Sequence, residues 1–240
     1  MKIVIATIKN WNIEKEQEIQ KKYIRAHEVY IITKKDEVCL EVLNSIKPDY
    51  IFFPHWSFFI PENVFLKYNC IVFHMTDLPY GRGGSPLQNL IVRGKSETKI
   101  SAIKVVKKLD AGPVYYKEDL SLEGSAEEIF RRASNIIFEK MIPKIIENDI
   151  QLTEQKGEIV EFKRRKPEES KIEPDFSVRQ IYNYIRMLDA EGYPSAFIEY
   201  GDYILDFSKA ELLDDDTVKA NVIFRRKSNE QNSCCSSTSR

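Results

Sequence analysis

The sequence has few cysteines and almost no net charge, and both shortages exclude whole classes of protein. The four cysteines form no Cys-x-x-Cys pair and have no histidine at metal-ligand spacing, so we expect no metal site and a reducing, cytoplasmic setting. Acidic and basic side chains nearly cancel, 37 against 36. No strong overall field therefore attracts nucleic acid or a membrane surface.

Long apolar runs and nucleotide-binding loops are also missing. No apolar stretch is long enough to span a bilayer, and the amino terminus enters a predicted strand without the layout of a signal peptide. The first strand is followed by residues 6–10, Ala-Thr-Ile-Lys-Asn, instead of a Gly-x-Gly-x-x-Gly turn. Nicotinamide binding of the Rossmann type is therefore disfavoured, and no Walker loop is present.

The first half of the chain alternates strand and helix patterns. Short apolar runs predict strands over residues 2–6, 28–32, 50–53 and 70–73, and helical spacing of apolar residues predicts helices over 13–24, 38–46 and 61–68. This alternation favours an α/β fold with a Rossmann-like, mainly parallel sheet covered on both faces. Ligands of such sheets bind at the carboxyl ends of the strands.

The second half predicts a long helix and then a smaller unit. Ser125 as N-cap and Glu128 form a capping box for a helix over residues 126–147, in which we expect a kink at Pro143 because proline lacks a backbone donor. We expect a catalytic domain over residues 1–150 and a small helix-plus-strand extension over residues 151–226. Residues 227–240 are small and polar, which is typical of a disordered tail.

A compact basic run, Lys163-Arg164-Arg165-Lys166, lies in the predicted extension. Such a run is either a solvated linker or a surface that steers a phosphorylated substrate toward a cleft, and the sequence leaves both interpretations open.

The most informative stretch begins at His74, at the end of a strand-like run. His74 opens a loop that contains Leu78-Pro79, Arg82-Gly83 and Pro86. A second loop, Leu109-Asp110-Ala111-Gly112-Pro113, begins 35 residues after His74. A histidine at a strand end is either a packed core residue or a catalytic one. The combination of motifs resembles the folate-dependent formyltransferases, the family of the glycinamide ribonucleotide, methionyl-tRNA and nucleotide-sugar N-formyltransferases.

The resemblance implies transfer of a formyl group from 10-formyltetrahydrofolate to an amine, without a metal. It also implies that His74 stabilises the oxyanion that develops during the transfer, and that Asp110 orients His74 and accepts or donates protons. The family has an asparagine two residues before the histidine, and here that residue is Val72. We expect His55, at the end of the neighbouring strand, to supply the missing donor, although an aromatic-cluster histidine beside Trp56 fits the sequence about as well.

The resemblance also implies binding residues. It places the pterin ring of the donor against two segments, Trp56, Ser57, Phe58 and Val106, Lys107, Lys108, Leu109. The expected substrate contacts are Thr76, Asp77, Arg82, Gly83 and Gln88, with Arg82 ordering its loop more than taking part in chemistry.

The net charge of the chain and the length of its C-terminal extension indicate the acceptor of the formyl group. A neutral chain with a short extension favours an amino-deoxy sugar linked to a nucleotide, with no nucleic acid or membrane partner and with a homodimer left open. A methionyl-tRNA formyltransferase-like enzyme is the alternative, and the loss of the family asparagine leaves room for a non-catalytic folate or nucleotide-sugar binding protein.

Overall fold

The computed structural model describes residues 1–240 except 11, 14, 16–26, 215 and 228–240. It divides into two compact units, residues 1–165 and 166–240, which are considered separately. Most of the helix predicted over residues 13–24 lies outside the described residues, as does the tail predicted over 227–240 except for Lys227.

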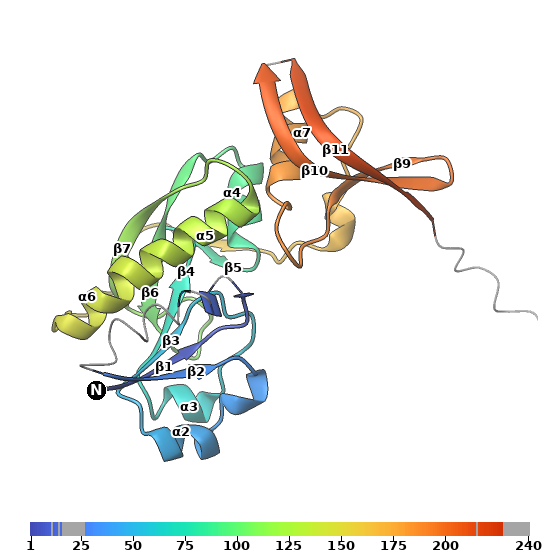
Figure 1. The fold of residues 1–240 in the computed structure, drawn as a ribbon. Helices are drawn as coiled ribbons and strands as arrows, with labels where there is room; N and C mark the ends of the chain where they lie inside the picture. Colours follow the sequence, from blue (N-terminus) through green and yellow to red (C-terminus); the bar gives the residue numbers. More distant parts are fainter. Residues whose placement is uncertain (11, 14, 16–26, 215, 228–240) are drawn as a thin grey trace, which may run out of the picture. The chain divides into compact units, whose positions relative to one another are not determined.

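The first unit is built on a six-stranded sheet with the strand order β2-β1-β3-β4-β6-β7 (Figure 1). Its strands are β1 (Lys2–Ala6), β2 (Glu28–Ile32), β3 (Tyr50–Phe53), β4 (Cys70–His74), β6 (Glu97–Lys104) and β7 (Val114–Ser121). The first four in spatial order are parallel, and β6 and β7 are antiparallel to their neighbours. The mainly parallel Rossmann-like α/β fold predicted from the sequence is therefore confirmed.

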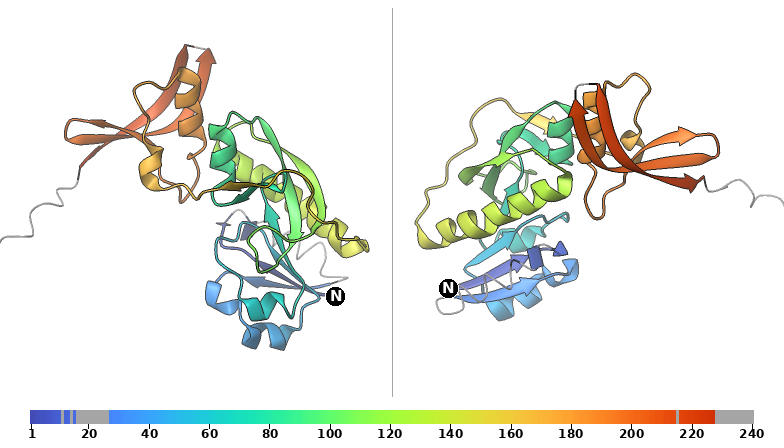
Figure 2. Two further views of the ribbon diagram at one scale, coloured as in Figure 1. Left: turned by 180° about the vertical axis from the view of Figure 1, so that it is seen from behind. Right: turned by 45° about the horizontal axis from the view of Figure 1, so that its top comes forward.

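Alternation along the strands sends successive side chains to opposite faces of the sheet. Val4, Ile51 and Cys70 are among the residues that form one buried cluster with Leu43 of α2 (Leu40–Ile46) and Val64 of α3 (Glu62–Phe65). Figures 1 and 2 show α5 and α6 lying along the opposite face. His74 has the same parity as Cys70 along β4, so its side chain belongs to the face covered by α2 and α3.

The long helix predicted over residues 126–147 is interrupted in the structure. It consists of α5 (Ala126–Ile136), a π-helical turn (Ile137–Met141) and α6 (Ile142–Glu147). The predicted capping box is present, since Ser125 Oγ accepts from Glu128 N and Ser125 N donates to Glu128 Oε2. These hydrogen bonds hold the pKa of Glu128 below its usual range. The irregular turn comes just before Pro143, which has no N–H to continue the helical ladder.

A glycine-rich segment that was expected to be a loop forms part of a second sheet. β5 (Tyr80–Gly83) pairs in parallel with β8 (Val160–Phe162), and Thr153 bridges to Val114 of β7. The first unit consequently runs to Arg165, beyond the predicted boundary near residue 150, because the intervening segment is bound to the main domain. α4 (Pro86–Val92) follows β5 directly.

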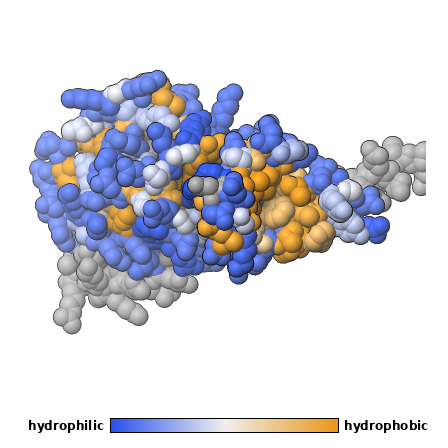
Figure 3. Space-filling view, turned by 90° about the horizontal axis from the view of Figure 1, so that it is seen from above, coloured by the Kyte–Doolittle hydropathy of each residue, from blue (hydrophilic) through white to orange (hydrophobic). Residues whose placement is uncertain are grey.

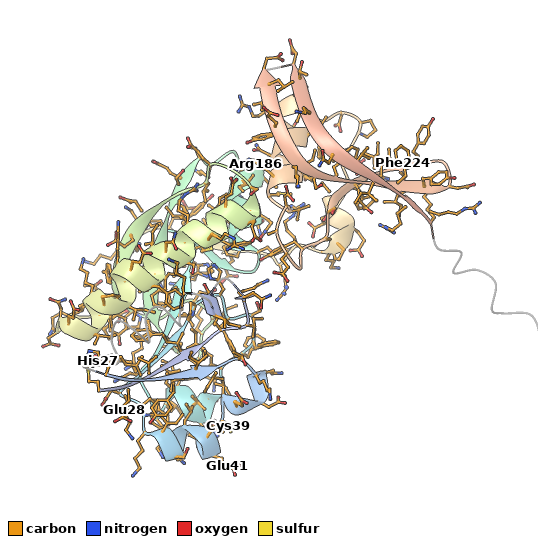
Figure 4. The ribbon with its side chains drawn as sticks, in the orientation of Figure 1. His27, Glu28, Cys39, Glu41, Arg186 and Phe224 are labelled. Atoms are coloured by element: carbon orange, nitrogen blue, oxygen red, sulfur yellow. The ribbon has the colours of Figure 1, made fainter. Side chains whose placement is uncertain are left out.

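The second unit contains a helix and a three-stranded antiparallel sheet. After a 3-10 turn (Pro167–Ser170) come α7 (Val178–Arg186), β9 (Ala196–Tyr200), β10 (Tyr203–Asp214) and β11 (Thr217–Arg226). Several large apolar side chains of this sheet are exposed, among them Tyr200, Ile223 and Phe224. Figure 3 shows hydrophobic side chains gathered on this unit, and Figure 4 labels Phe224 on its outer strands. Among the described residues, no helix has the length and apolarity needed to cross a membrane.

Candidate active site

His74 is fixed in one orientation at the carboxyl end of β4. Its Nε2 lies 2.7 Å from the carbonyl oxygen of Gly81. Since a carbonyl oxygen only accepts, Nε2 must carry the hydrogen and donate it. The second ring nitrogen, Nδ1, then faces Asp110, whose Oδ2 lies 3.6 Å away. Both side chains are about nine-tenths buried, so their charges are little screened by water.

The Asp110 carboxylate is held by the glycine-rich strand. Its Oδ2 accepts a hydrogen bond of 2.9 Å from the backbone N–H of Gly83. Asp110 has a positive φ of 49°, an uncommon conformation for a residue with a side chain. This conformation lies in the turn that precedes β7 and directs the carboxylate back toward His74. The structure thus brings together the two side chains selected from the sequence, and it adds Gly81 and Gly83 as their backbone partners.

Gln155 joins the Asp110 loop to Arg82. Its Nε2 donates to the carbonyl oxygens of Asp110 and Gly112, both at 2.8 Å. Its Oε1 accepts from Nε and from a terminal nitrogen of Arg82, at 3.1 and 2.7 Å. Arg82 is thus linked to the Asp110 loop through Gln155, a residue that no sequence pattern singled out.

The other four residues expected to contact substrate differ in their exposure and in their hydrogen-bond partners. Thr76 is fully buried and donates to the same Gly81 carbonyl as His74, so it supports the loop from inside. Gln88 is only 3% exposed, which does not support the expected contact with substrate. Asp77 is exposed and forms an ion pair with Lys117 at 2.5 Å. The backbone N–H of Gly83 donates to the Asp110 carboxylate and is therefore not available to a substrate.

The two segments expected to hold the pterin ring lie close together. Lys107 forms an ion pair of 3.4 Å with Glu62, which follows the Trp56–Phe58 segment at the start of α3. Trp56 packs against the same buried cluster as Val105, the residue just before the second segment. Ser57, Lys107, Lys108 and the apolar Phe58 and Leu109 are exposed, and Val106 is half-buried.

One donor in the first segment lacks an acceptor. The indole Nε1 of Trp56 is buried, and no described residue accepts its hydrogen. Exposed apolar groups beside backbone polar groups and an unused donor fit a flat heterocycle with many acceptors, such as a pterin.

Val72 cannot take the role of the family asparagine. It is half-buried and packs against Leu78, Ile103 and Val114. A side chain in this apolar environment offers no hydrogen to an oxyanion. In the described structure, His74 is consequently the side chain on β4 that can serve the developing charge.

His55 has contacts that differ from those an oxyanion donor needs. Its Nδ1 lies 3.2 Å from the amide nitrogen of Asn12, which donates to it, and its ring meets Phe130 of α5 edge-on at 5.5 Å. Its Nε2 is buried from solvent, although the residue as a whole is partly exposed. Burial lowers the pKa of His55 to about 4. These contacts correspond to the packing role that the sequence analysis set beside the catalytic one.

The buried neutral His55 predicts a specific loss of stability in acid. The unfolded chain binds a proton at His55 near pH 6.5 and the folded chain only near pH 4. The unfolded state therefore binds more protons in this window, and stability falls as the pH is lowered through it, by at most about 3 kcal/mol. Urea unfolding of wild type and His55→Gln between pH 8 and pH 4 should show this loss in wild type alone. Equal pH dependence in the two proteins would contradict the buried, neutral state.

A surface hollow of about 640 Å³ lies away from the His74–Asp110 pair. It is lined by Asp77 and Tyr80 and by residues of α4, β6 and β7, but by neither His74 nor Asp110. The hollow is therefore a separate feature from the candidate pair of His74 and Asp110. Within the described ranges, no group of three or more His, Cys, Asp or Glu side chains is arranged to hold a metal ion.

Comparison with known proteins agrees with this geometry. The family model described as "Formyl transferase" matches residues 3–135, and one described as "Methionyl-tRNA formyltransferase, C-terminal domain" matches residues 167–225. The methionyl-tRNA formyltransferase of Rickettsia africae is 28% identical over 200 residues, which cover 79% of this chain and 65% of that protein. The chain thus spans about two thirds of the length of this relative.

Solved structures agree over a larger share of the chain. A structure titled methionyl-tRNA formyltransferase from Clostridium thermocellum is 52% identical, with a TM-score of 0.92, and the match covers 95% of this chain and all of that one. A sugar N-formyltransferase from Shewanella shares the fold, with a TM-score of 0.67 at 12% identity over 95% of this chain and 97% of that one. The matched family model covers more than half of the chain, including β4 and the Asp110 loop, and we conclude that this protein belongs to the formyl transferase family.

Proposed function

We propose that the protein transfers the formyl group of 10-formyltetrahydrofolate to a primary amine, and that methionyl-tRNA is the acceptor. The observation that supports the transfer is the buried pair of His74 and Asp110, held by Gly81 and Gly83 beside the two expected pterin segments.

The reaction needs charge stabilisation and proton transfer, and the pair offers both. The amine nitrogen attacks the formyl carbon, the bond from this carbon to N10 of the folate breaks, and one proton leaves the amine while N10 gains one. With Nε2 committed to Gly81, the protonated His74 presents its Nδ1–H toward the developing oxyanion. The Asp110 carboxylate stabilises that imidazolium and can accept the proton of the amine, directly or through water.

The 3.6 Å separation of Nδ1 and Asp110 Oδ2 is compatible with this role. It is longer than a hydrogen bond, so neither group is fully committed to the other, and each can bond to a substrate or water atom that lies beside the pair. Catalytic hydrogen bonds in ligand-free sites commonly shorten when the substrate binds.

Methionyl-tRNA is favoured by the relatives. The protein that is 52% identical over its full length bears that name, and so do the relative from Rickettsia africae and the family model that matches residues 167–225. This reverses the order of acceptors expected from the sequence, where near-neutral charge favoured a nucleotide-linked amino sugar.

The amino sugar remains a second candidate because of the charge of the C-terminal unit. Residues 166–240 carry 14 acidic and 10 basic side chains, whereas a surface that binds tRNA phosphates needs a basic excess. The sugar N-formyltransferase from Shewanella also matches this chain over nearly its whole length, although at an identity that supports the fold alone.

Parallel activity assays with each acceptor decide between the two candidates. Purified protein and 10-formyltetrahydrofolate are mixed with methionyl-tRNA and, separately, with amino-deoxy sugars linked to nucleoside diphosphates. We expect formylmethionyl-tRNA, detected by mass spectrometry after hydrolysis of the ester. Formylation of a sugar with methionyl-tRNA left unchanged would select the second candidate, and folate binding without any formamide would indicate a binding protein.

Gln155 provides a test of how the Asp110 loop is positioned. Gln155→Glu keeps the shape of the side chain but removes the N–H donor to the Asp110 and Gly112 carbonyls. We expect kcat to fall about tenfold to a hundredfold with the KM for folate nearly unchanged, because the carboxylate moves while the pterin segments stay. Gln151→Ala, at an exposed position nearby, is the matched control and should leave kcat as in wild type. A Gln155→Glu variant with normal kcat would show that the loop does not depend on this residue.

A further inference from the structure

The first of the two expected pterin segments begins at a turn with an uncommon backbone conformation. β3 ends at Phe53, and His55, the second residue after it, has a positive φ of 52°. Residues with a side chain seldom adopt this conformation, and it persists where surrounding contacts fix it. The turn at Pro54 and His55 sets the direction in which Trp56 leaves the sheet. Whatever holds the turn therefore also places the segment that follows it.

Asn12 contacts both residues of this turn. Its Nδ2 lies 3.3 Å from the carbonyl oxygen of Pro54 and 3.2 Å from Nδ1 of His55. A carbonyl oxygen only accepts, which identifies the nitrogen as the side-chain atom of Asn12 that faces the turn. Asn12 is fully buried and lies 43 positions before His55 in the chain. The conformation of the turn thus depends on a residue that is distant in the sequence.

Thr7, directly after β1, completes this contact. Its Oγ1 accepts a hydrogen bond of 2.9 Å from Asn12 Nδ2 and donates its own hydrogen to the Pro54 carbonyl, also at 2.9 Å. Thr7 is fully buried as well. Because a buried carbonyl that loses its donors is costly, the hydroxyl of Thr7 and the amide of Asn12 together stabilise the turn.

α5 fixes the amide of Asn12 from the other side. Ser134 Oγ donates to Asn12 Oδ1 at 2.6 Å, and Ser134 is buried. Since an amide oxygen only accepts, this bond keeps the oxygen on α5 and the nitrogen on the turn. Phe130, one helical turn before Ser134, meets the His55 ring edge-on at 5.5 Å. A connected chain of hydrogen bonds therefore runs from α5 through Asn12 to the turn.

Trp56 links this network to the donor site. Its ring lies edge-on to the ring of Phe53 at 5.8 Å and to that of Phe58 at 5.4 Å. Its Nε1 is buried, and no described residue accepts its hydrogen. A rotation at the turn would move this donor together with the backbone groups of residues 56–58. A flat heterocycle needs these groups in one fixed arrangement, because few polar contacts orient it.

We propose that Asn12, supported by Thr7 and Ser134, is a positioning residue for the formyl donor, because it holds residues 56–58 in the arrangement that receives the pterin ring. The inference rests on the proposed function and adds three buried residues outside the expected pterin segments to the determinants of donor binding. These residues act through the turn at 54–55 and not by touching folate. A site that is already ordered before its ligand arrives binds more tightly, because less ordering accompanies binding.

Kinetics separate positioning from chemistry. In Asn12→Ala, the KM for 10-formyltetrahydrofolate should rise about tenfold, while kcat and the KM for the acceptor change less than about twofold. This pattern is the opposite of that expected for Gln155→Glu, in which kcat falls. Ile145→Val is the matched control, since it removes a methyl group from the buried side of α6 and should lower thermal stability without changing the folate KM. An equal rise in the folate KM of Ile145→Val, or none in Asn12→Ala, would overturn the inference.

Thr7 gives a second test that keeps the shape of the side chain. Thr7→Val replaces the hydroxyl by a methyl group, so the Pro54 carbonyl loses one donor and Asn12 loses one acceptor. The folate KM should rise, as in Asn12→Ala. Thr7→Ser retains the hydroxyl and should keep the KM close to the wild-type value. This pair also carries the test if Asn12→Ala does not fold, and equal KM values in Thr7→Val and Thr7→Ser would contradict the network's role in donor binding.

Fluorescence of Trp56 distinguishes failure of this inference from failure of the proposed function, since it requires neither folate nor turnover. The chain has two tryptophans, and the difference between each protein and its Trp56→Phe counterpart isolates the indole of residue 56. Acrylamide should quench this signal more strongly in Asn12→Ala and Thr7→Val than in wild type or Ile145→Val, because the indole is no longer held in its buried position. Stronger quenching supports the inference even if no formamide is formed. Equal quenching in all four proteins overturns it even if formyl transfer is observed.

Discussion

Replacing His74 or Asp110 by asparagine should lower the turnover of formyl transfer by about a thousandfold in either case, and combining the two changes should cost little more. General acid–base groups contribute roughly a hundredfold to ten-thousandfold, and groups that act as one unit are strongly non-additive. The 3.6 Å between His74 Nδ1 and Asp110 Oδ2 is the structural reason to expect such coupling.

Folding should survive these replacements, because His74 ends β4 and Asp110 lies in the turn before β7, where asparagine also tolerates a positive φ. Steady-state kinetics of the single and double variants, with thermal unfolding as the control for folding, measures the coupling. Additive losses from the two variants would show that His74 and Asp110 serve separate steps, which the proposed mechanism does not allow.

Gly112→Ala should have the largest effect on stability that we predict. A Cβ at this position would lie 1.7 Å from the carbonyl oxygen of Lys104, the last residue of β6. The backbone of the turn or of β6 must therefore move to make room for it. The displaced turn contains Asp110 and is bound by Gln155 through the Gly112 carbonyl. We expect a loss of more than about 3 kcal/mol of unfolding free energy, together with loss of turnover.

Gly94→Ala is the control for this experiment. Gly94 also has a positive φ, of 70°, but no atom lies within 4 Å of an added Cβ. It should therefore show only the conformational cost of about 1 kcal/mol. Urea unfolding of both variants measures the difference, and a Gly112→Ala protein no less stable than Gly94→Ala would contradict the close contact with β6.

Local patterns were sufficient to predict most of the main sheet. The strands that hold Ile3, Phe52 and Val72 lie in one sheet as expected, because short apolar runs between helical patterns leave little alternative. β5 was not predicted, since a Tyr-Gly-Arg-Gly segment has low strand propensity and is stabilised by its pairing with β8, which is distant in sequence. The first compact unit runs past the expected boundary near residue 150 for the same reason, because Thr153 and β8 are bound by long-range pairing.

In the candidate site as well, residues in a local motif could be selected from the sequence, whereas residues that bond to distant parts of the chain could not. His74 and Asp110 were identified from their spacing in a motif. Gln155 and Asn12 act through hydrogen bonds to carbonyls far along the chain, and no pattern in the sequence marks such bonds. His55 was selected because it ends a strand beside β4, but its positive φ and its contact with Asn12 turn the ring into a buried polar network.

Overall charge is a weak guide to the acceptor. A balance of 37 acidic and 36 basic side chains conceals a net acidic C-terminal unit and a basic run over residues 163–166. Binding depends on where charges lie relative to the reacting groups, and a sum over the chain removes that information.

The central claim is that this site moves a formyl group from folate to an amine, and a labelled donor tests it most directly. The protein is incubated with 10-[¹³C]formyltetrahydrofolate and methionyl-tRNA, and the products are analysed by mass spectrometry. We predict one labelled formamide for each tetrahydrofolate released by wild type, and neither product above background from His74→Asn. Labelled formate in place of formamide, or equal product from His74→Asn, would contradict the account.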